Sequence, residues 1–248
     1  MSHSDNAFFQ RNYMALCEAP HIKNVMLEGN VGAGKSTFLR IIGQALQVPV
    51  VYEPHEKWQT INASENLLDA FYKDPHRWAY TFQSYAFVTR IMEQERSERL
   101  NHDKPIQLIE RSVYSDRYCF AQNCFEMGLM NSLEWSLYTE WFDWLVQTYV
   151  HKPAGFIYLR TDPQVCYDRM VTRNRSEEAT VSLDYIQRLH QKHEEWLVHK
   201  KGVADFLQKI PVLVLDCNKD FEHSPEEQKK HSAAIKDFFA ELTSNREE

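Results

Sequence analysis

The stretch Gly29-Asn30-Val31-Gly32-Ala33-Gly34-Lys35-Ser36 decides the fold, because it matches the pattern G-x-x-x-x-G-K-S of a phosphate-binding loop. Such a loop turns its backbone N–H groups toward an anion, and glycine permits the tight path that this requires. Lys35 can reach the β- and γ-phosphates of a nucleoside triphosphate, and the Ser36 hydroxyl can hold Mg²⁺. We therefore expect ATP to contact Gly29, Asn30, Val31, Gly32, Ala33, Gly34, Lys35, Ser36 and Thr37.

The segments on either side of this loop have the pattern of a strand–loop–helix unit. Val25-Met26-Leu27 is an apolar run typical of a buried parallel strand. Phe38-Leu39-Arg40-Ile41-Ile42 predicts a helix, which we expect to begin at about Lys35. The N-terminal dipole of that helix favours the anion that the loop binds, so both features point to one phosphate site.

Composition indicates a globular chain without nucleic-acid or membrane character. With 248 residues, of which 43% are hydrophobic and 13% aromatic, the chain is long enough for one domain with a sizeable core. The net charge of −7 argues against general binding to nucleic acid or to a membrane surface. No apolar run approaches the roughly 18 residues that a membrane-spanning helix needs.

The cellular location is predicted from the N-terminus and the cysteines. Residues 1–10 lack the basic and apolar regions of a signal peptide, and they are poor in arginine, which disfavours a mitochondrial transit peptide. The five cysteines are scattered and odd in number, as expected for reduced thiols. We therefore expect a cytoplasmic protein, while a longer native N-terminus would leave a mitochondrial location open.

Apolar runs alternate with helical patterns along the chain. We expect strands over 23–28, 48–53, 105–110, 155–160 and 212–216. We expect helices over about 35–46, 64–73, 75–100, 115–126 and 132–149, then from 163, over 182–200 and over 226–242. This alternation predicts the α/β class, with a five-stranded parallel sheet flanked by helices. The chain then divides into a flexible N-terminal tail (1–20), a single domain (21–242) and a polar tail (243–248).

An acidic residue ends the second expected strand, at the sheet edge where ligands of parallel sheets bind. This residue is Glu53, which is followed by Pro54, with Trp58 close behind. A carboxylate placed so rigidly beside aromatic walls could act as general base toward a substrate hydroxyl. The alternative is a strand-end salt bridge.

A second acidic residue, Glu110, ends the third expected strand and is followed directly by Arg111. Glu110 can hold Mg²⁺ directly or through water, and it could also share the role of base with Glu53. Arg111 can bridge a phosphate and the nucleophilic oxygen. The alternative for Glu110 and Arg111 is a surface ion pair.

A cluster of arginines follows the fourth expected strand. Arg169 and Arg173 are four residues apart and share one helix face, and Arg175 comes shortly after them. Arginines aimed at the phosphates neutralise charge that spreads in the transition state, and one such arginine accelerates related reactions by roughly 10³–10⁵-fold. Arginine clusters on helices are more often solvated surface, which is the alternative here.

Several ordered motifs resemble the deoxyribonucleoside kinase family, which includes deoxycytidine kinase, deoxyguanosine kinase, mitochondrial thymidine kinase and the insect multisubstrate kinase. The string from Glu110 to Tyr118 has this family's form E-R-S-x-x-S-x-R-Y. Further matches are Glu53-Pro54 with Trp58, the run from Tyr72 to Trp78, Phe82-Gln83-Ser84-Tyr85, the R-x-x-x-R-x-R-x-E-E lid from Arg169 to Glu178, and Leu189 to Leu197. The resemblance covers about residues 22–222.

The resemblance implies a phosphate-loop kinase that transfers the γ-phosphoryl group of ATP, with Mg²⁺, to the 5′-hydroxyl of a deoxynucleoside in nucleotide salvage. Glu53 would be the base, held by Arg111, and Mg²⁺ would lie at Ser36 and Glu110. The catalytic residues would be Glu53, Glu110, Arg111, Lys35 and Arg175. The deoxynucleoside would contact Glu53, Trp58, Leu68, Tyr72, Phe82, Gln83, Arg111, Phe120 and Glu178. ATP would contact Arg169, Arg173 and Arg175 in the lid, and Asp220 and Phe221 beside adenine.

The resemblance also divides the deoxynucleoside site. Tyr72 and Glu178 would bind the sugar 3′-hydroxyl, and Gln83 would pair with the base. Phe82 and Phe120 would stack around the base, and the remaining apolar walls would be Val31, Trp58, Leu68 and Phe71.

Arg90 and Asp116 predict which base is preferred. Arg90 lies seven residues after Gln83 on the same helix face, and Asp116 faces it in the family pattern. A carboxylate held by an arginine accepts a hydrogen bond from the exocyclic amine of cytosine or adenine, whereas thymine would leave a polar group unpaired, at a cost of roughly 1–3 kcal/mol. We expect deoxycytidine and purine deoxynucleosides to be preferred over thymidine. A thymidine-preferring or broad multisubstrate kinase is the alternative, because His55 replaces the family's usual apolar residue and the 58–67 connection is short.

The helix expected over 132–149 has a broad apolar surface. One face carries Leu133, Leu137, Trp141, Trp144, Leu145 and Thr148, while Trp135 and Tyr138 lie beyond it. A helix that is apolar over more than its core stripe often packs on two sides, so we expect a homodimer interface here, against the alternative of double burial within one chain. The family that the chain resembles is homodimeric, in agreement with this expectation.

Two other classes of phosphate-loop protein fit less well. A guanine-nucleotide switch would need the motif N-K-x-D, whereas Asn218-Lys219-Asp220-Phe221 has its aspartate one residue early. A nucleoside monophosphate kinase would clamp a second phosphate with arginines, whereas Glu53 and Glu178 suit neutral hydroxyls.

Overall fold

The computed structural model describes residues 22–62 and 65–244, so the tail predicted over 1–20 lies outside the described residues. The strands are β1 (Lys23–Glu28), β2 (Val50–Val51), β3 (Ile106–Glu110), β4 (Gly155–Arg160) and β5 (Val212–Asp216). The helices are α2 (Lys35–Leu46), α3 (His55–Gln59), α4 (Leu67–Lys73), α5 (Pro75–Leu100), α6 (Val113–Ser115), α7 (Gln122–Glu126), α8 (Ser132–Tyr149), α9 (Pro163–Arg173), α10 (Leu183–His193), α11 (Asp205–Gln208) and α12 (Pro225–Ser244). No helix in this part of the chain is long and apolar enough to cross a membrane.

The strands form one parallel sheet in the order β2-β3-β1-β4-β5. The central strand β1 pairs with β3 on one side and with β4 on the other. Leu27 is opposite Glu110, so the chain leaves β1 and β3 at neighbouring points of the same edge. The predicted α/β class and five-stranded sheet are confirmed.

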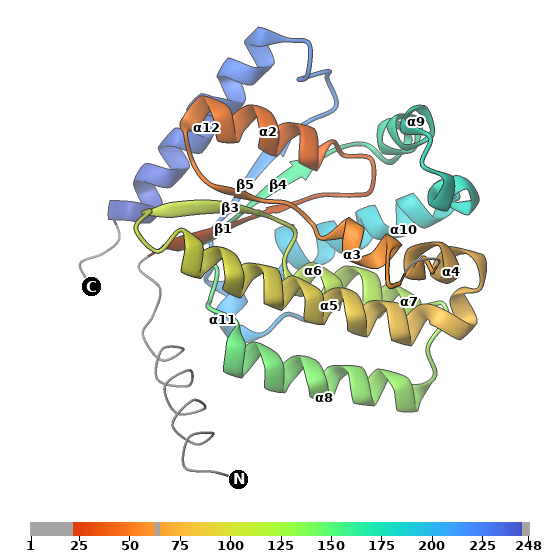
Figure 1. The fold of residues 1–248 in the computed structure, drawn as a ribbon. Helices are drawn as coiled ribbons and strands as arrows, with labels where there is room; N and C mark the ends of the chain where they lie inside the picture. The colour runs from red at the N-terminus through yellow and green to blue at the C-terminus, as the bar shows by residue number, and fades with distance from the viewer. Residues whose placement is uncertain (1–21, 63–64, 245–248) are drawn as a thin grey trace, which may run out of the picture.

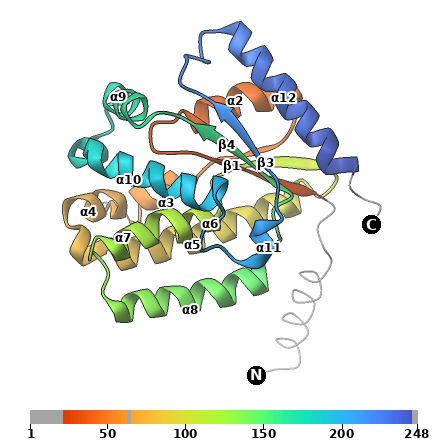
Figure 2. The same cartoon turned by 180° about the vertical axis from the view of Figure 1, so that it is seen from behind.

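Helices cover both faces of the sheet (Figure 1; Figure 2). On one face α2 and α12 pack over a core that includes Phe38, Leu39, Ile42, Ile235 and Phe238. On the other face α5 packs on the sheet and α8 lies outside α5, around a core that includes Phe82, Phe87, Tyr114, Tyr138, Phe142 and Phe156. The sheet therefore separates two apolar layers, and its carboxyl edge stays open between them.

Local capping determines where several helices begin. Asp74 accepts a hydrogen bond from the backbone N–H of Arg77 at 3.3 Å, with Pro75 as the first residue of α5. Asp162 accepts from the N–H of Gln164 at 2.9 Å, again with a proline, Pro163, first in α9. Both arrangements satisfy N–H groups that a helix leaves unpaired, and both predicted starts are confirmed.

Other boundaries differ from the prediction. The strand expected over 48–53 is reduced to Val50–Val51, because it is an edge strand that pairs only with β3. The helix expected from 64 begins at Leu67, where the Asn66 side chain caps the N–H of Asp69 at 2.8 Å. At the other end, α12 continues to Ser244, two residues into the expected polar tail.

The helix expected over 115–126 begins earlier and is not uniform. Ser112 and Ser115 form a reciprocal capping box, so α6 already begins at Val113. The chain then continues as a π-helical segment over Asp116–Ala121 before α7. A second π-helical segment, Glu194–Val198, follows α10, which ends at His193 within the helix expected over 182–200. Such π-helical turns are often found at functional sites.

The helix α8 has one buried and one exposed apolar face. Tyr138 and Phe142 are buried, and their rings lie 6.0 and 5.4 Å from the Phe87 ring of α5. Most of the predicted broad face is directed outward, because Leu133, Leu137, Trp141 and Trp144 are exposed. Leu145 at its border is half-buried against the core, and Thr148 is half-buried as well. The side that the sequence placed beyond that face is therefore the one that packs on the core.

Candidate active site

A cavity of about 610 Å³ opens at the carboxyl edge of the sheet, beside the phosphate loop. Most of the predicted site residues line it: Val31, Gly32, Gly34, Lys35, Ser36, Thr37, Glu53, Trp58, Leu68, Phe71, Tyr72, Phe82, Gln83, Arg90, Glu110, Arg111, Asp116, Phe120, Arg169, Arg173, Arg175, Glu178 and Phe221. Four predicted residues are not part of the lining: Gly29, Asn30, Ala33 and Asp220. Tertiary folding thus gathers residues from positions 31 to 221 around one space.

The phosphate loop has the backbone geometry that its glycines predict. Gly32 and Gly34 have φ values of +79° and +89°, which side chains rarely adopt. The Lys35 ammonium donates to the backbone carbonyl of Asn30 at 2.9 Å, so it is held inside the loop. Burial lowers the pKa of Lys35 to about 7. Asn30 itself braces the loop, because its amide donates to the Ile186 carbonyl at 2.8 Å.

Ser36 and Glu110 lie together across the junction of loop and sheet. The Ser36 hydroxyl donates to Glu110 at 2.9 Å, and the backbone N–H of Glu53 lies 3.5 Å from the other oxygen of the same carboxylate. One hydroxyl and one carboxylate beside a phosphate loop are the donors that Mg²⁺ uses together with phosphate oxygens and water. The described residues contain no group of three or more His, Cys, Asp or Glu side chains placed to hold a metal ion.

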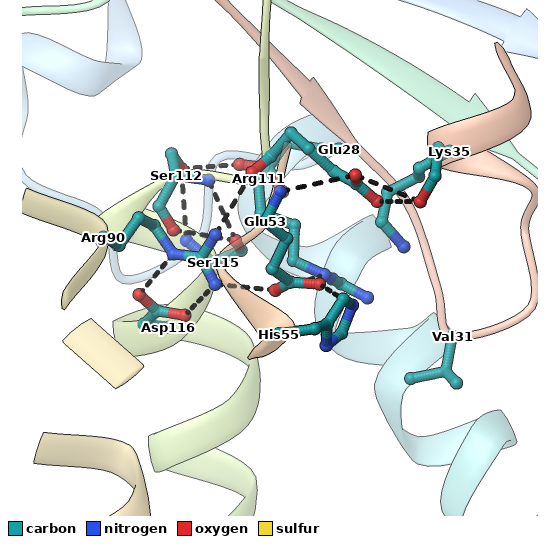
Figure 3. Close-up of polar contacts among 12 residues, drawn as sticks. Glu28, Val31, Lys35, Glu53, His55, Arg90, Arg111, Ser112, Ser115 and Asp116 are labelled. Carbon is teal, nitrogen blue, oxygen red and sulfur yellow. Dashed lines mark hydrogen bonds and ion pairs between the residues drawn. The ribbon is translucent and has the colours of Figure 1, made fainter. Parts of the chain in front are cut away.

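Glu53 is held at both carboxylate oxygens (Figure 3). Arg90 donates to Oε1 at 2.7 Å and Arg111 lies 3.3 Å from the same oxygen, while Nε2 of His55 lies 3.0 Å from Oε2. The side chain of Glu53 is only 7% exposed. Burial alone would raise the pKa of Glu53, but His55, Arg111 and Arg90 outweigh it and hold the pKa well below its usual value. The carboxylate is therefore ionised.

Arg111 has a backbone conformation that no sequence pattern predicted. Its φ is +61°, in the left-handed region, and its N–H donates to the Leu27 carbonyl at 2.8 Å. Its guanidinium lies over the Phe120 ring, 4.6 Å from the centroid. Non-glycine residues in this region cost free energy and concentrate at functional sites. With this backbone conformation, the Arg111 side chain lines the cavity just after the end of β3.

Arg90 joins two carboxylates. Besides Glu53, it contacts Asp116 twice, at 2.8 Å through Nε and at 3.1 Å through Nη2, and Nη1 donates to the Glu110 carbonyl at 3.1 Å. The predicted pairing of Arg90 with Asp116 is therefore present, and the contact with Glu53 was not predicted.

Aromatic side chains form the walls at the α4–α5 end of the cavity. The Phe71 and Phe82 rings stack with centroids 4.8 Å apart, and Trp58 meets Phe82 edge-on at 5.6 Å. The Trp58 indole N–H donates to the Thr89 hydroxyl at 2.9 Å, which fixes the ring. Gln83 is buried beside them, and its amide has a weak partner in the Cys124 sulfur at 3.8 Å. A planar apolar ligand with a polar edge fits such a space.

The arginine cluster divides between two roles. Arg173 donates to both oxygens of Glu178, at 2.6 and 2.7 Å, and Arg175 lies 3.8 Å from the same carboxylate. Arg169 donates to the backbone carbonyls of Cys217 and Lys219, each at 3.0 Å. All three line the cavity, and Glu178 lies among them. Asp220 instead caps its own turn, by accepting from the N–H of Glu222 at 2.8 Å.

Some residues of the site were missed from the sequence. Asp168 and Thr172 line the cavity, and they lie next to the arginines of α9, so the helix periodicity could have found them. Tyr185 and Glu222 also line it, and no pattern marks them. Glu28 is buried just before the phosphate loop, accepts from the Ser112 hydroxyl at 2.5 Å, and has its pKa raised by burial to about 7.

Comparisons with known proteins place the chain in a family. The family model described as deoxynucleoside kinase matches residues 25–240. The chain is 41% identical to mouse deoxycytidine kinase over 231 residues, covering 84% of this chain and 89% of that protein. It is 38% identical to human deoxycytidine kinase over 237 residues, covering 87% and 91%. It is 39% identical to mitochondrial deoxyguanosine kinase of Xenopus laevis over 241 residues, covering 89% and 91%.

Proposed function

Because the chain belongs to the deoxynucleoside kinase family, and is therefore an ATP-dependent nucleoside kinase of nucleotide salvage, we propose a mechanism and a base preference for it. It transfers the γ-phosphoryl group of ATP to the 5′-hydroxyl of a deoxynucleoside, and it prefers deoxycytidine and purine deoxynucleosides to thymidine. The observation that carries the mechanism is the ionised carboxylate of Glu53, in one cavity with the phosphate loop and the aromatic walls.

Glu53 accepts the proton of the 5′-hydroxyl while the hydroxyl oxygen attacks the γ-phosphorus. The bond from that phosphorus to the β–γ bridging oxygen breaks, and ADP leaves with the electron pair. The transition state of such transfers is loose, so the carboxylate acts mainly by orienting the hydroxyl. Its low pKa is compatible with this role, because an ionised carboxylate accepts the hydrogen bond at neutral pH.

Positive groups surround the place where the triphosphate would lie. Lys35 would reach the β- and γ-phosphates from the loop, and Arg111 would bridge the γ-phosphate and the hydroxyl. Arg169, Arg173 and Arg175 would close over the phosphates as a lid, with Arg173 and Arg175 exchanging part of their contact with Glu178 for phosphate. Phe221, beside Gly34, would border adenine, whereas the Asp220 side chain caps its own turn and is not part of the cavity lining.

Ser36 and Glu110 would hold Mg²⁺ between the loop and β3. The ion would neutralise charge on the phosphates during transfer. Glu110 would then be a metal ligand rather than the base, because its carboxylate faces Ser36 while that of Glu53 faces Arg90 and Arg111.

The deoxynucleoside would lie between the aromatic walls and Glu53. Trp58, Leu68, Phe82 and Phe120 would enclose the base, and Gln83 would pair with its polar edge through an amide that has only a weak partner. Tyr72 and Glu178 would bind the 3′-hydroxyl. Asp116, held by Arg90, would accept from the exocyclic amine of the base.

Names of relatives support this base preference. The similar proteins from mouse and human are deoxycytidine kinases, and the similar protein from Xenopus laevis is a deoxyguanosine kinase. A thymidine-preferring kinase, a monophosphate kinase and a nucleotide switch are not favoured. The compartment stays a prediction, since the Xenopus protein is named as mitochondrial and we expected a cytoplasmic one.

The chain would act as a homodimer of single-domain subunits. The support is the outer face of α8, where Leu133 is 67% exposed, Trp141 53% and Trp144 51%. Exposed apolar patches of this kind mark interaction sites.

The test is phosphorylation of deoxycytidine, deoxyadenosine, deoxyguanosine and thymidine, each with ATP and Mg²⁺, compared by kcat/KM. We expect deoxycytidine or a purine deoxynucleoside to lead and thymidine to trail. Deoxycytidine monophosphate serves as the control acceptor and should not be phosphorylated. If thymidine leads, the assigned role of Arg90 and Asp116 is wrong; if only the monophosphate reacts, the proposed acceptor is wrong.

A further inference from the structure

His55 touches the reactive carboxylate and belongs to none of the roles assigned so far. It is the first residue of α3, lines the cavity, and is separated from Glu53 only by Pro54. Its Nε2 lies 3.0 Å from Oε2 of Glu53 (Figure 3). His55, a residue of the cavity wall, thus contacts the Glu53 carboxylate, which would accept the hydrogen bond from the substrate hydroxyl.

The contacts of Glu53 leave little room for a substrate hydroxyl. A carboxylate offers about four lone-pair positions for hydrogen bonds. Arg90 and Arg111 lie on Oε1, at 2.7 and 3.3 Å, and His55 lies on Oε2. Among the residues that the structure describes, Arg90 donates to this carboxylate, and Arg111 and His55 form ion-pair contacts with it. Oε1 therefore has contacts from two arginines and Oε2 a contact from His55 alone, so Oε2 is the less occupied oxygen.

The ring of His55 is held in place from its other side. It meets the Trp58 ring edge-on, with centroids 5.2 Å apart, and Trp58 is itself fixed by its hydrogen bond to Thr89. Nδ1 of His55 is buried without a hydrogen-bond partner. The tautomer with its proton on Nε2 directs that N–H toward Oε2 of Glu53, and leaves no buried N–H unpaired at Nδ1.

We infer that His55 is a positioning residue for the reaction, which donates to Oε2 of Glu53 and so orients the carboxylate to accept the 5′-hydroxyl at this less occupied oxygen. His55 keeps its own proton, and the hydroxyl proton goes to Glu53 as described above. The inference rests on the proposed role of Glu53. Trp58, which belongs to the aromatic wall around the base, thereby also supports the catalytic carboxylate, because it holds the His55 ring that contacts Glu53.

Three substitutions separate this role from simple packing. His55→Gln retains an amide N–H at the place of Nε2, His55→Asn carries its amide at the place of Nδ1, and His55→Val has no donor. We expect His55→Val and His55→Asn to lower kcat by roughly tenfold, as for one lost hydrogen bond to a charged group, and His55→Gln to stay within about threefold of the original chain. The KM for ATP should change less than about twofold. His102→Val, an exposed histidine after α5, is the control and should leave kcat unchanged.

A double-mutant cycle with Glu53 gives the decisive measurement. The full chain is assayed with Mg²⁺-ATP and its best deoxynucleoside as Glu53→Gln, as His55→Val and as both together. We expect His55→Val to have almost no further effect once Glu53 is glutamine. Equal losses in both backgrounds, or equal kcat for the Gln, Asn and Val variants, would overturn the inference and leave the proposed function intact. If Glu53→Gln alone has no effect on kcat, the proposed base itself is wrong, and this inference with it.

Discussion

Arg90 joins the two carboxylates to which we assign different roles, Glu53 in catalysis and Asp116 in reading the nucleobase. Its guanidinium is buried and contacts Glu53 and Asp116 together, at 2.7 and 2.8 Å. If a buried arginine that pairs with two carboxylates moves away from one of them, that carboxylate keeps a buried charge without a partner. A shift of Asp116, where the nucleobase would be read, should therefore move Arg90 and change its contact with Glu53. A poorly matched nucleobase should then reduce kcat as well as affinity.

The first prediction concerns the pair Arg90 and Asp116. Replacing them together, as Arg90→Met with Asp116→Ala, should raise the ratio of thymidine to deoxycytidine kcat/KM by roughly tenfold or more, because a charged group no longer opposes the thymine carbonyl. The overall kcat should fall, since Glu53 loses one of its donors. Asp116→Asn alone keeps Arg90 on Glu53 and should retain more of the rate. An unchanged thymidine ratio in the double variant would contradict the base-reading role.

At the scale of elements, the conformation of the phosphate loop depends on contact with α9 as well as on its own glycines. A Cβ placed on Gly32 would lie 2.0 Å from the backbone carbonyl oxygen of Cys166, in the first turns of α9. That atom belongs to a helix backbone and cannot move aside as a side-chain tip would. The loop and α9, which carries Arg169 and Arg173, are therefore packed as one unit.

The second prediction compares two glycines with similar backbones. Gly32 has φ +79° and Gly128 has φ +72°, but a Cβ on Gly128 would meet nothing within 4 Å. Gly128→Ala should lower the free energy of unfolding by only about 1–2 kcal/mol, from the left-handed conformation alone. Gly32→Ala should cost more through the clash, and it should also raise the KM for ATP. Equal losses in chemical denaturation would mean that α9 does not constrain the loop.

A polar cluster around the buried Glu98 connects the end of α5 with the segment after α8, near the start of β1, where Asn24 donates to the same carboxylate. Nδ1 of His151 lies 2.8 Å from a Glu98 oxygen, and Glu98 also accepts from Gln94 at 2.9 Å. The hydrogen bond to Glu98 raises the pKa of His151 above its usual value. A raised pKa in the folded state means that folding favours the protonated imidazole.

The third prediction is a pH dependence of stability. The contribution of protonated His151 is complete below the unfolded-state pKa, and it is lost as the pH rises through the raised folded-state pKa. His151→Gln should therefore lower the free energy of unfolding more at about pH 5.5 than at about pH 8.5. The exposed His102→Gln is the control and should show no such difference. A loss independent of pH would mean that the pair is not charged in the folded chain.

For the whole molecule, the sheet order places the site and the exposed face of α8 at different parts of the surface. The site lies at the carboxyl edge, where β1 is flanked by β3 and β4 and the direction of the chain path reverses. The outer face of α8 lies beyond α5, away from the phosphate loop (Figure 1; Figure 2). A subunit interface on α8 would therefore leave the cavity accessible.

The fourth prediction is that this face forms the dimer. Sedimentation at micromolar concentration should give a dimer for the original chain and a monomer for Trp141→Glu with Trp144→Glu, because two charges would be buried in an apolar interface. Ser136→Glu, an exposed position of the same helix outside the apolar face, should remain dimeric. A monomer in the original chain at that concentration would refute the interface.

Prediction from the sequence succeeded where one local signal is strong. The bounds of β1, β4 and β5 and of α5 agree with the structure, since continuous apolar runs and an Asp–Pro start leave few alternatives. It was wrong at β2 and at the start of α6, where edge pairing and a reciprocal serine cap decide the ends. It left open which face of α8 is directed inward, because both faces are apolar and the contacts of Tyr138 and Phe142 with Phe87 select one.

The sequence by itself determined the fold class and the phosphate loop, because both depend on local spacing, and its resemblance to one family supplied most residues of the site. Only the tertiary structure decided how Glu53 is held. His55 is two residues away in the chain, but Arg90 and Arg111 come from α5 and from the end of β3, and no local pattern specifies which oxygen each contacts. Burial makes these contacts strong, since a low-dielectric surrounding leaves a carboxylate no water to replace them. The orientation of the Glu53 carboxylate therefore follows from contacts between separate elements and from no single segment.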